Sequence, residues 1–119
     1  PLAERALRIT ASALGPDHPD VAYSLDMLGA LALARGRPAD AISPLERALV
    51  INAGAAPLRL AQTRGLLARA LWGAPVGAGR DRGRAGDLAG QALAVLRAAG
   101  DAHAKDVAEL EAWLRSREP

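Results

Sequence analysis

The sequence Glu-Arg-Ala-Leu-Arg-Ile at residues 4–9 returns as Glu-Arg-Ala-Leu-Val-Ile at residues 46–51, which is 42 residues further along the chain. Each copy follows a Pro-Leu pair, and a weaker third copy, Gln-Ala-Leu-Ala-Val, occupies residues 91–95. Self-similarity at a fixed period of about 20–50 residues is the signature of proteins that stack one supersecondary unit several times. The recurrence therefore predicts a repeat architecture.

The segment between the first two copies predicts two helices in each unit. Residues 15–20, Gly-Pro-Asp-His-Pro-Asp, suit a helix end followed by a helix start, because Gly accepts the left-handed stop and Pro fits the first turn. We expect Asp17 to be the N-cap of the following helix. Gly-Arg-Pro at residues 36–38 then separates this helix from the next one. Apolar positions between these breaks recur at helical spacing: Ala22, Leu25, Leu28, Gly29, Ala32 and Leu33.

The composition favours helices packed on helices. Half of the 119 residues are apolar, but the chain has no Phe, one Tyr and two Trp, so its core must close through short side chains. Ala and Leu are good helix formers, whereas the β-branched and aromatic residues that favour strands are scarce. We expect no sheet and one compact unit.

Net charge and cysteine content exclude several classes of protein. The formal net charge of +2 is weak evidence for an anionic partner, so we expect no nucleic acid ligand. The chain has no Cys, which excludes disulfides and thiolate metal sites and suits the reducing environment of the cytoplasm. No apolar run approaches the roughly 18 residues of a membrane span, so we expect no membrane contact in this segment.

Two spaced motifs carry a family resemblance. The patterns Leu25-x-x-Leu28-Gly29-x-x-Ala32 and Ala41-x-x-x-Leu45-x-x-Ala48 resemble the tetratricopeptide repeat signature, with Leu and Ala at its aromatic positions. The 42-residue period and the run from Ala13 to Ala22 resemble its kinesin-light-chain-like subclass. This resemblance implies an all-α fold, a right-handed α-solenoid of antiparallel helix pairs with about six helices.

We expect residues 1–119 to form a single tetratricopeptide-type domain. Residues 1–14 are the second helix of a truncated repeat, residues 18–53 a full repeat, and residues 57–99 a degenerate repeat with a loop insertion at 73–83. Residues 101–117 form a capping helix, with Asp101 as its N-cap. On this helix we expect Val107, Leu110 and Leu114 to point inward and Lys105, Asp106, Glu109 and Arg115 to point outward.

The first helix is expected to lack partners. Leu2, Ala6 and Ile9 would lose half of their neighbours without a preceding helix, so we expect either further repeats before them in a longer protein or a compensating contact that covers them. This open N-terminal edge is also a candidate surface for self-association.

Catalytic residues are not evident. Neither His18 nor His103 has a Ser and a carboxylate arranged for nucleophilic catalysis. The spacing of the glycines and arginines in residues 73–84 fits neither the G-x-G-x-x-G motif nor the P-loop. We expect this segment to be a disordered or loosely ordered insertion. We therefore expect no enzyme activity, no cofactor and no metal site in this segment.

The expected partner-binding surface is the concave side, which the first helix of each unit lines. The family geometry implies that Tyr23, Asp26, Ala30 and Leu33 face this groove from residues 20–35, and that Gln62, Gly65, Arg69 and Trp72 face it from residues 58–73. The family often has Asn at positions 26 and 27, where this chain has Asp26 and Met27. The chain also lacks the Lys and Asn set with which some relatives bind a C-terminal carboxylate. We expect Asp26 and Arg69 to select a ligand segment of complementary charge.

The sequence thus indicates a module that binds a peptide or a partner protein. An alternative comes from residues 68–114, which resemble the C-terminal arms of bacterial serine/threonine protein kinases. In that case the segment is a regulatory or substrate-docking arm. The kinase motifs themselves do not occur in this segment.

Overall fold

The computed structural model describes residues 2–54 and 56–117, and in these residues all regular structure is helical. The helices are α1 (Leu2–Leu14), α2 (Pro19–Ala34), α3 (Pro38–Asn52), α4 (Pro57–Gly73), α5 (Arg82–Ala98) and α6 (Ala104–Arg115), with a 3₁₀ turn η1 (Asp101–His103) before α6. The expected all-α fold of about six helices is confirmed. The Pro-Leu pair that precedes the first repeat copy and the end of the expected domain include residues 1, 118 and 119, which lie outside the described residues.

Proline sets the start of three helices. Pro19, Pro38 and Pro57 each occupy the first positions of α2, α3 and α4, where the missing N–H leaves no hydrogen bond unmade. The N-cap of α2 is His18, whose Nδ1 accepts from the backbone N–H of Asp20 at 3.1 Å. The prediction of Asp17 as this N-cap was wrong by one residue.

The start of the last helix also differs from the prediction. Asp101 opens the 3₁₀ turn and makes no capping bond, because Gly100, at φ 92°, redirects the chain just before it. Helix α6 begins three residues later, at Ala104, and its flanking residue His103 makes no side-chain cap bond.

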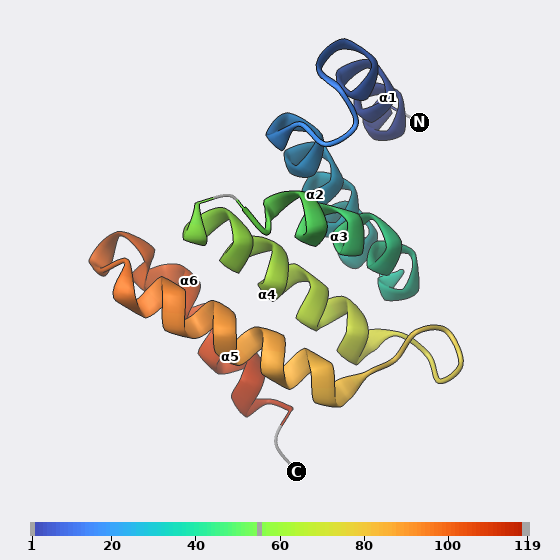
Figure 1. The fold of residues 1–119 in the computed structure, drawn as a ribbon. Coiled ribbons are helices and arrows are strands. Elements are labelled where there is room, and N and C mark those ends of the chain that lie inside the picture. Colours follow the sequence, from blue (N-terminus) through green and yellow to red (C-terminus); the bar gives the residue numbers. More distant parts are fainter. Residues whose placement is uncertain (1, 55, 118–119) are drawn as a thin grey trace.

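The helices stack in chain order. Each helix packs against the next from α1 to α6, and α2 also contacts α4 (Figure 1). The stack measures 44 × 36 × 20 Å, and its short dimension equals about two helix diameters. This two-layer arrangement of helical hairpins is a tetratricopeptide-like helical solenoid.

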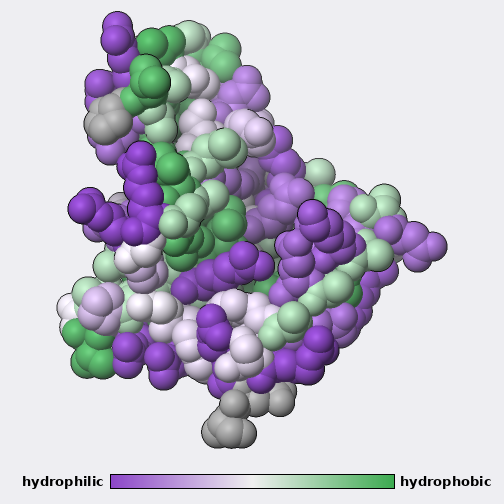
Figure 2. All heavy atoms as spheres, turned by 180° about the vertical axis from the view of Figure 1, so that it is seen from behind, coloured by the Kyte–Doolittle hydropathy of each residue, from purple (hydrophilic) through white to green (hydrophobic). Residues whose placement is uncertain are grey.

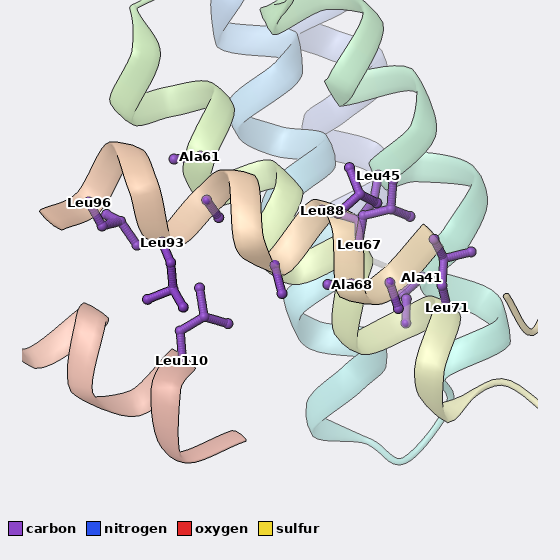
Figure 3. Packing of buried hydrophobic residues seen from close by; sticks show 14 residues of the cluster. Ala41, Leu45, Ala61, Leu67, Ala68, Leu71, Leu88, Leu93, Leu96 and Leu110 are labelled. Atoms are coloured by element: carbon purple, nitrogen blue, oxygen red, sulfur yellow. The ribbon is translucent and has the colours of Figure 1, made fainter. Parts of the chain in front are cut away.

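The main core lies between α3, α4, α5 and α6 and consists of Ala and Leu (Figure 3). Leu45 of α3 and Leu67 of α4 are fully buried in it, and Leu93 of α5 and Leu110 of α6 point toward one another. A smaller cluster of Val21, Ala22, Leu25 and Ala48 joins α2 to α3. Small side chains thus occupy most helix contacts.

Helix α1 is held on one side only. Leu7 and Ala11 pack against the smaller cluster, but no described residue of α1 is buried. Leu2 is 83% exposed and Ile9 61% exposed, and Ala6 is exposed as well. The expectation that these three side chains lack partners agrees with the structure.

The loop between α4 and α5 is held more firmly than its Gly-rich composition suggests. Arg80 Nε donates to the carbonyl of Ala74 at 2.9 Å, and the N–H of Asp81 donates to the carbonyl of Leu71 at 3.0 Å. Gly79, at φ 104°, lies so close to Ile42 of α3 that a Cβ there would stand 2.6 Å from Ile42 Cδ1. The insertion is therefore part of the packed structure.

Gly29 marks the closest approach of α2 and α3. A Cβ at this position would lie 2.5 Å from Cγ and Cδ2 of Leu45, a side chain with no exposed surface. Since Leu45 has nowhere to move in the main core, the two helices depend on a residue without a side chain at position 29.

We predict that Gly29→Ala destabilises the fold by about 1–3 kcal/mol, because the added methyl group overpacks the contact with Leu45. The control is Gly90→Ala on the exposed face of α5, where an added Cβ meets nothing within 4 Å. That change should stabilise the fold by about 0.5–1 kcal/mol through helix propensity. Urea denaturation followed by circular dichroism measures both changes. Equal effects of the two substitutions would show that the Gly29 contact is not tight.

Candidate binding groove

A groove of about 330 Å³ runs between α2, α4 and α6. Helix α2 contributes Tyr23, Asp26, Met27 and Ala30 to its wall. Figure 2 shows the molecule from this side: hydrophobic residues gather over α1 and α2, and hydrophilic residues surround α6. The groove therefore has one mainly apolar wall and one charged wall.

The opposite walls come from α4 and α6. Helix α4 supplies the small residues Ala61 and Gly65 together with Gln62, Leu66 and Arg69. Helix α6 supplies Asp106, Glu109 and Leu110, and Leu96 of α5 completes the lining.

The structure brings together five of the seven residues predicted for the binding surface. Tyr23, Asp26, Ala30, Gln62 and Arg69 all line the groove. Gly65, which the family geometry also placed there, lines it as well. That these residues contact a partner remains a prediction.

The other two predicted residues lie elsewhere. Leu33 packs against the main core. Trp72 meets Trp113 of α6 edge to face, with ring centroids 5.9 Å apart, and the guanidinium of Arg82 stacks over its ring at 4.7 Å. Both side chains are occupied by packing, Trp72 because Arg82 of α5 and Trp113 of α6 lie against its ring.

Sequence reasoning missed the contribution of α6. Asp106 and Glu109 were expected to point outward, and they do point away from the core, but that direction leads into the groove. The amphipathic pattern of residues 104–115 shows which face is polar, whereas only the docking of α6 on α5 shows what the polar face meets.

Asp26 belongs to a polar network that joins three helices. Thr63 Oγ1 of α4 lies 2.9 Å from both carboxylate oxygens of Asp26 and donates to them. Asn52 Nδ2, at the end of α3, donates to the same Thr63 oxygen at 3.1 Å. Asn52 and Thr63 have no exposed surface.

Burial raises the pKa of the Asp26 carboxyl group above its ordinary value, and the Thr63 hydrogen bond and the positive charge of Arg59 oppose this rise. The carboxylate is thus engaged by the protein itself. Its predicted role in selecting a charged ligand competes with this structural role.

The two arginines of α4 near the groove differ in their surroundings. Arg59 lies over the ring of Tyr23 at 5.4 Å and donates to the carbonyl of Pro19 at 3.1 Å. Arg69 lines the groove, and within the described residues its buried Nε has no hydrogen-bond partner.

Other candidate sites carry little chemistry. His18 caps α2, and His103 Nδ1 lies 3.5 Å from the carboxylate of Asp106. Among residues 2–54 and 56–117 no group of three or more His, Cys, Asp and Glu residues is arranged to hold a metal ion. In the same residues, no helix has the length and apolar character needed to cross a membrane.

The arginines of the α4–α5 region are also occupied. Arg80 bonds to Ala74, Arg82 stacks on Trp72, and Arg84 of α5 forms an ion pair with Glu46 of α3. These guanidinium groups hold the loop and the helix contacts together.

A second hollow, of about 390 Å³, lies between α1, α2 and α3. Leu25, Leu28 and Leu31 line it, and charged side chains including Arg35 and Arg37 surround it. It contains none of the seven residues predicted for binding.

We predict that the stability difference between the wild-type chain and Asp26→Asn depends on pH. Asn keeps a hydrogen-bond acceptor for Thr63 but does not ionise. Because the pKa of Asp26 is raised in the folded state, its stabilising contribution is complete below the unfolded pKa and is lost as pH rises through the folded pKa. The wild type should therefore lose stability relative to Asp26→Asn as pH rises from the unfolded pKa, about 3.9, through the higher folded pKa.

Urea denaturation at a series of pH values measures this difference. Asp87→Asn, an exposed change on α5, is the control and should show no comparable trend. A difference that stays constant, or that favours the wild type as pH rises, would contradict the burial of Asp26.

Comparison with protein families gives one match. Residues 1–51 match the family model described as Tetratricopeptide repeat. Comparisons with curated proteins and with solved structures gave no match. The matched region covers α1, α2 and most of α3, which include both copies of the repeated sequence. Together, this match over residues 1–51 and the stacked helical hairpins support the assignment of the chain to the tetratricopeptide repeat proteins.

Proposed function

We propose that the groove between α2, α4 and α6 binds a segment of a partner polypeptide. Tetratricopeptide repeats generally mediate protein–protein interactions. The observation that carries the proposal is the exposure of two large side chains at this groove, Tyr23 at 56% and Met27 at 53%. Large apolar side chains gathered at one concave site are typical of binding surfaces.

The groove also leaves room for a main chain. Ala30, Ala61 and Gly65 line it with small side chains, and a Cβ on Gly65 would meet nothing within 4 Å. A volume of about 330 Å³ accommodates a few side chains of a guest rather than a whole helix. An extended or turn-like segment fits these dimensions.

We also propose that α2 with α3 and α4 with α5 are the two repeats, at residues 18–53 and 57–99, flanked by the single helices of residues 1–14 and 101–117. The short connection between α2 and α3 supports this division, as does the 42-residue spacing of the sequence copies in α1 and α3. The exposed Leu2 and Ile9 of α1 make the N-terminal edge a candidate contact for a further repeat or a second copy.

The second candidate function is the regulatory or substrate-docking arm of a bacterial serine/threonine protein kinase. It rests on the resemblance of residues 68–114 alone and stays a prediction. The coding sequence upstream of Pro1 tests it: His-Arg-Asp and Asp-Phe-Gly motifs there would support the arm, and their absence from the complete reading frame would contradict it.

We predict that Gly65→Phe abolishes peptide binding while the fold is retained, because the new ring projects from α4 into the open groove. Peptides are first selected on the wild-type chain from a displayed library of random sequences. Their affinities for the variants are then measured by fluorescence anisotropy, and a loss of more than about tenfold is expected for Gly65→Phe.

Gly90→Phe is the matched control, since Gly90 is also a helical glycine with open space around its Cβ but lies on the exposed face of α5. Circular dichroism confirms that both variants fold. Selected peptides that bind Gly65→Phe as well as Gly90→Phe would place the binding surface outside the groove.

A further inference from the structure

The groove carries the opposite sign of charge from the chain as a whole. Three carboxylates line it, those of Asp26, Asp106 and Glu109, and one guanidinium, that of Arg69, while the guanidinium of Arg59 lies nearby over the ring of Tyr23. The complete chain has a formal net charge of +2. An acidic groove in a basic protein attracts cationic groups to that groove and disfavours them elsewhere on the surface.

The carboxylates of α6 are the accessible ones. Asp106 lies 3.5 Å from Nδ1 of His103, and Glu109 lies 3.9 Å from Nζ of Lys105, a side chain that is 86% exposed. Contacts this long between partly exposed side chains contribute little, so a guest can replace them at small cost. The carboxylate of Asp26, in contrast, already accepts from the buried Thr63.

The spacing on α6 favours one cation. Asp106 and Glu109 are three residues apart on a helix, so their side chains share a face about 5–6 Å apart. A single guanidinium or ammonium group can contact both. Met27 of α2, which is 53% exposed, lines the same groove and offers it apolar surface.

We propose that the guest of this groove is a peptide segment with an Arg or Lys side chain next to an apolar one, the cation lying against Asp106 and Glu109 and the apolar side chain against Met27. This inference rests on the proposed function of the groove. Arg69, on the α4 wall, repels a cation at its own end and so gives the guest one orientation.

The test uses the same displayed library of random peptides, selected on the wild-type chain and sequenced. Arg and Lys should be enriched over Asp and Glu in the selected peptides. Their affinity should fall about fivefold or more for the double variant Asp106→Asn and Glu109→Gln, and the salt dependence of binding should weaken. Arg69→Gln, which removes the repelling charge, should raise their affinity.

The matched control is the double variant Asp17→Asn and Asp87→Asn, which removes two exposed carboxylates outside the groove and should keep wild-type affinity. Selected peptides that are rich in Asp and Glu and that lose affinity for Arg69→Gln would overturn this inference and leave the proposed function standing. Failure to select any peptide that Gly65→Phe excludes would overturn both.

Discussion

Close approach of helices through small side chains is the constraint on which the whole stack depends. Of the nineteen buried hydrophobic residues among those described, ten are alanines and eight are leucines. The short alanine side chains let helix axes approach, and Leu45 and Leu67 fill the spaces between them. Gly29 is the limiting case, since α2 reaches α3 only where no Cβ intervenes. A core without Phe can reach native packing density only in this way.

Local features of the fold were predictable from the sequence because they depend on neighbours along the chain. Helical periodicity fixed the faces of α2 and α4, and so five of the seven predicted groove residues lie where expected. The positions of Asp106 and Glu109 were not predictable, since they depend on how α6 docks. The hydrogen bond between Thr63 and Asp26 was not predictable for the same reason, because the two residues are 37 positions apart in the sequence and only the tertiary fold brings them together. The cap of α2 was missed because Asp17 and His18 are both adjacent polar candidates, and only the backbone path decides between them.

The polar network of Asn52, Thr63 and Asp26 gives a mostly apolar stack one point of directional bonding. Alanine and leucine contacts tolerate sliding of one helix along another, whereas hydrogen bonds between buried groups hold only at one offset. The network joins α2, α3 and α4, which are the helices that meet where the two proposed repeats adjoin. The register of this junction, and with it the shape of the groove wall, therefore rests on three polar side chains.

The edge-to-face pair of Trp72 and Trp113 has a consequence for spectroscopy. These are the two indoles of the chain, and both lie at the contact of α4 with α6, with Arg82 and Arg117 stacked over them. Tryptophan fluorescence, excited at the red edge of the absorption band, consequently reports on the contact of α4 with α6 at the C-terminal end of the helical stack. Detachment of α1 from α2 would leave this emission unchanged, because neither helix contains a Trp. Following that detachment requires a separate fluorescent label on α1.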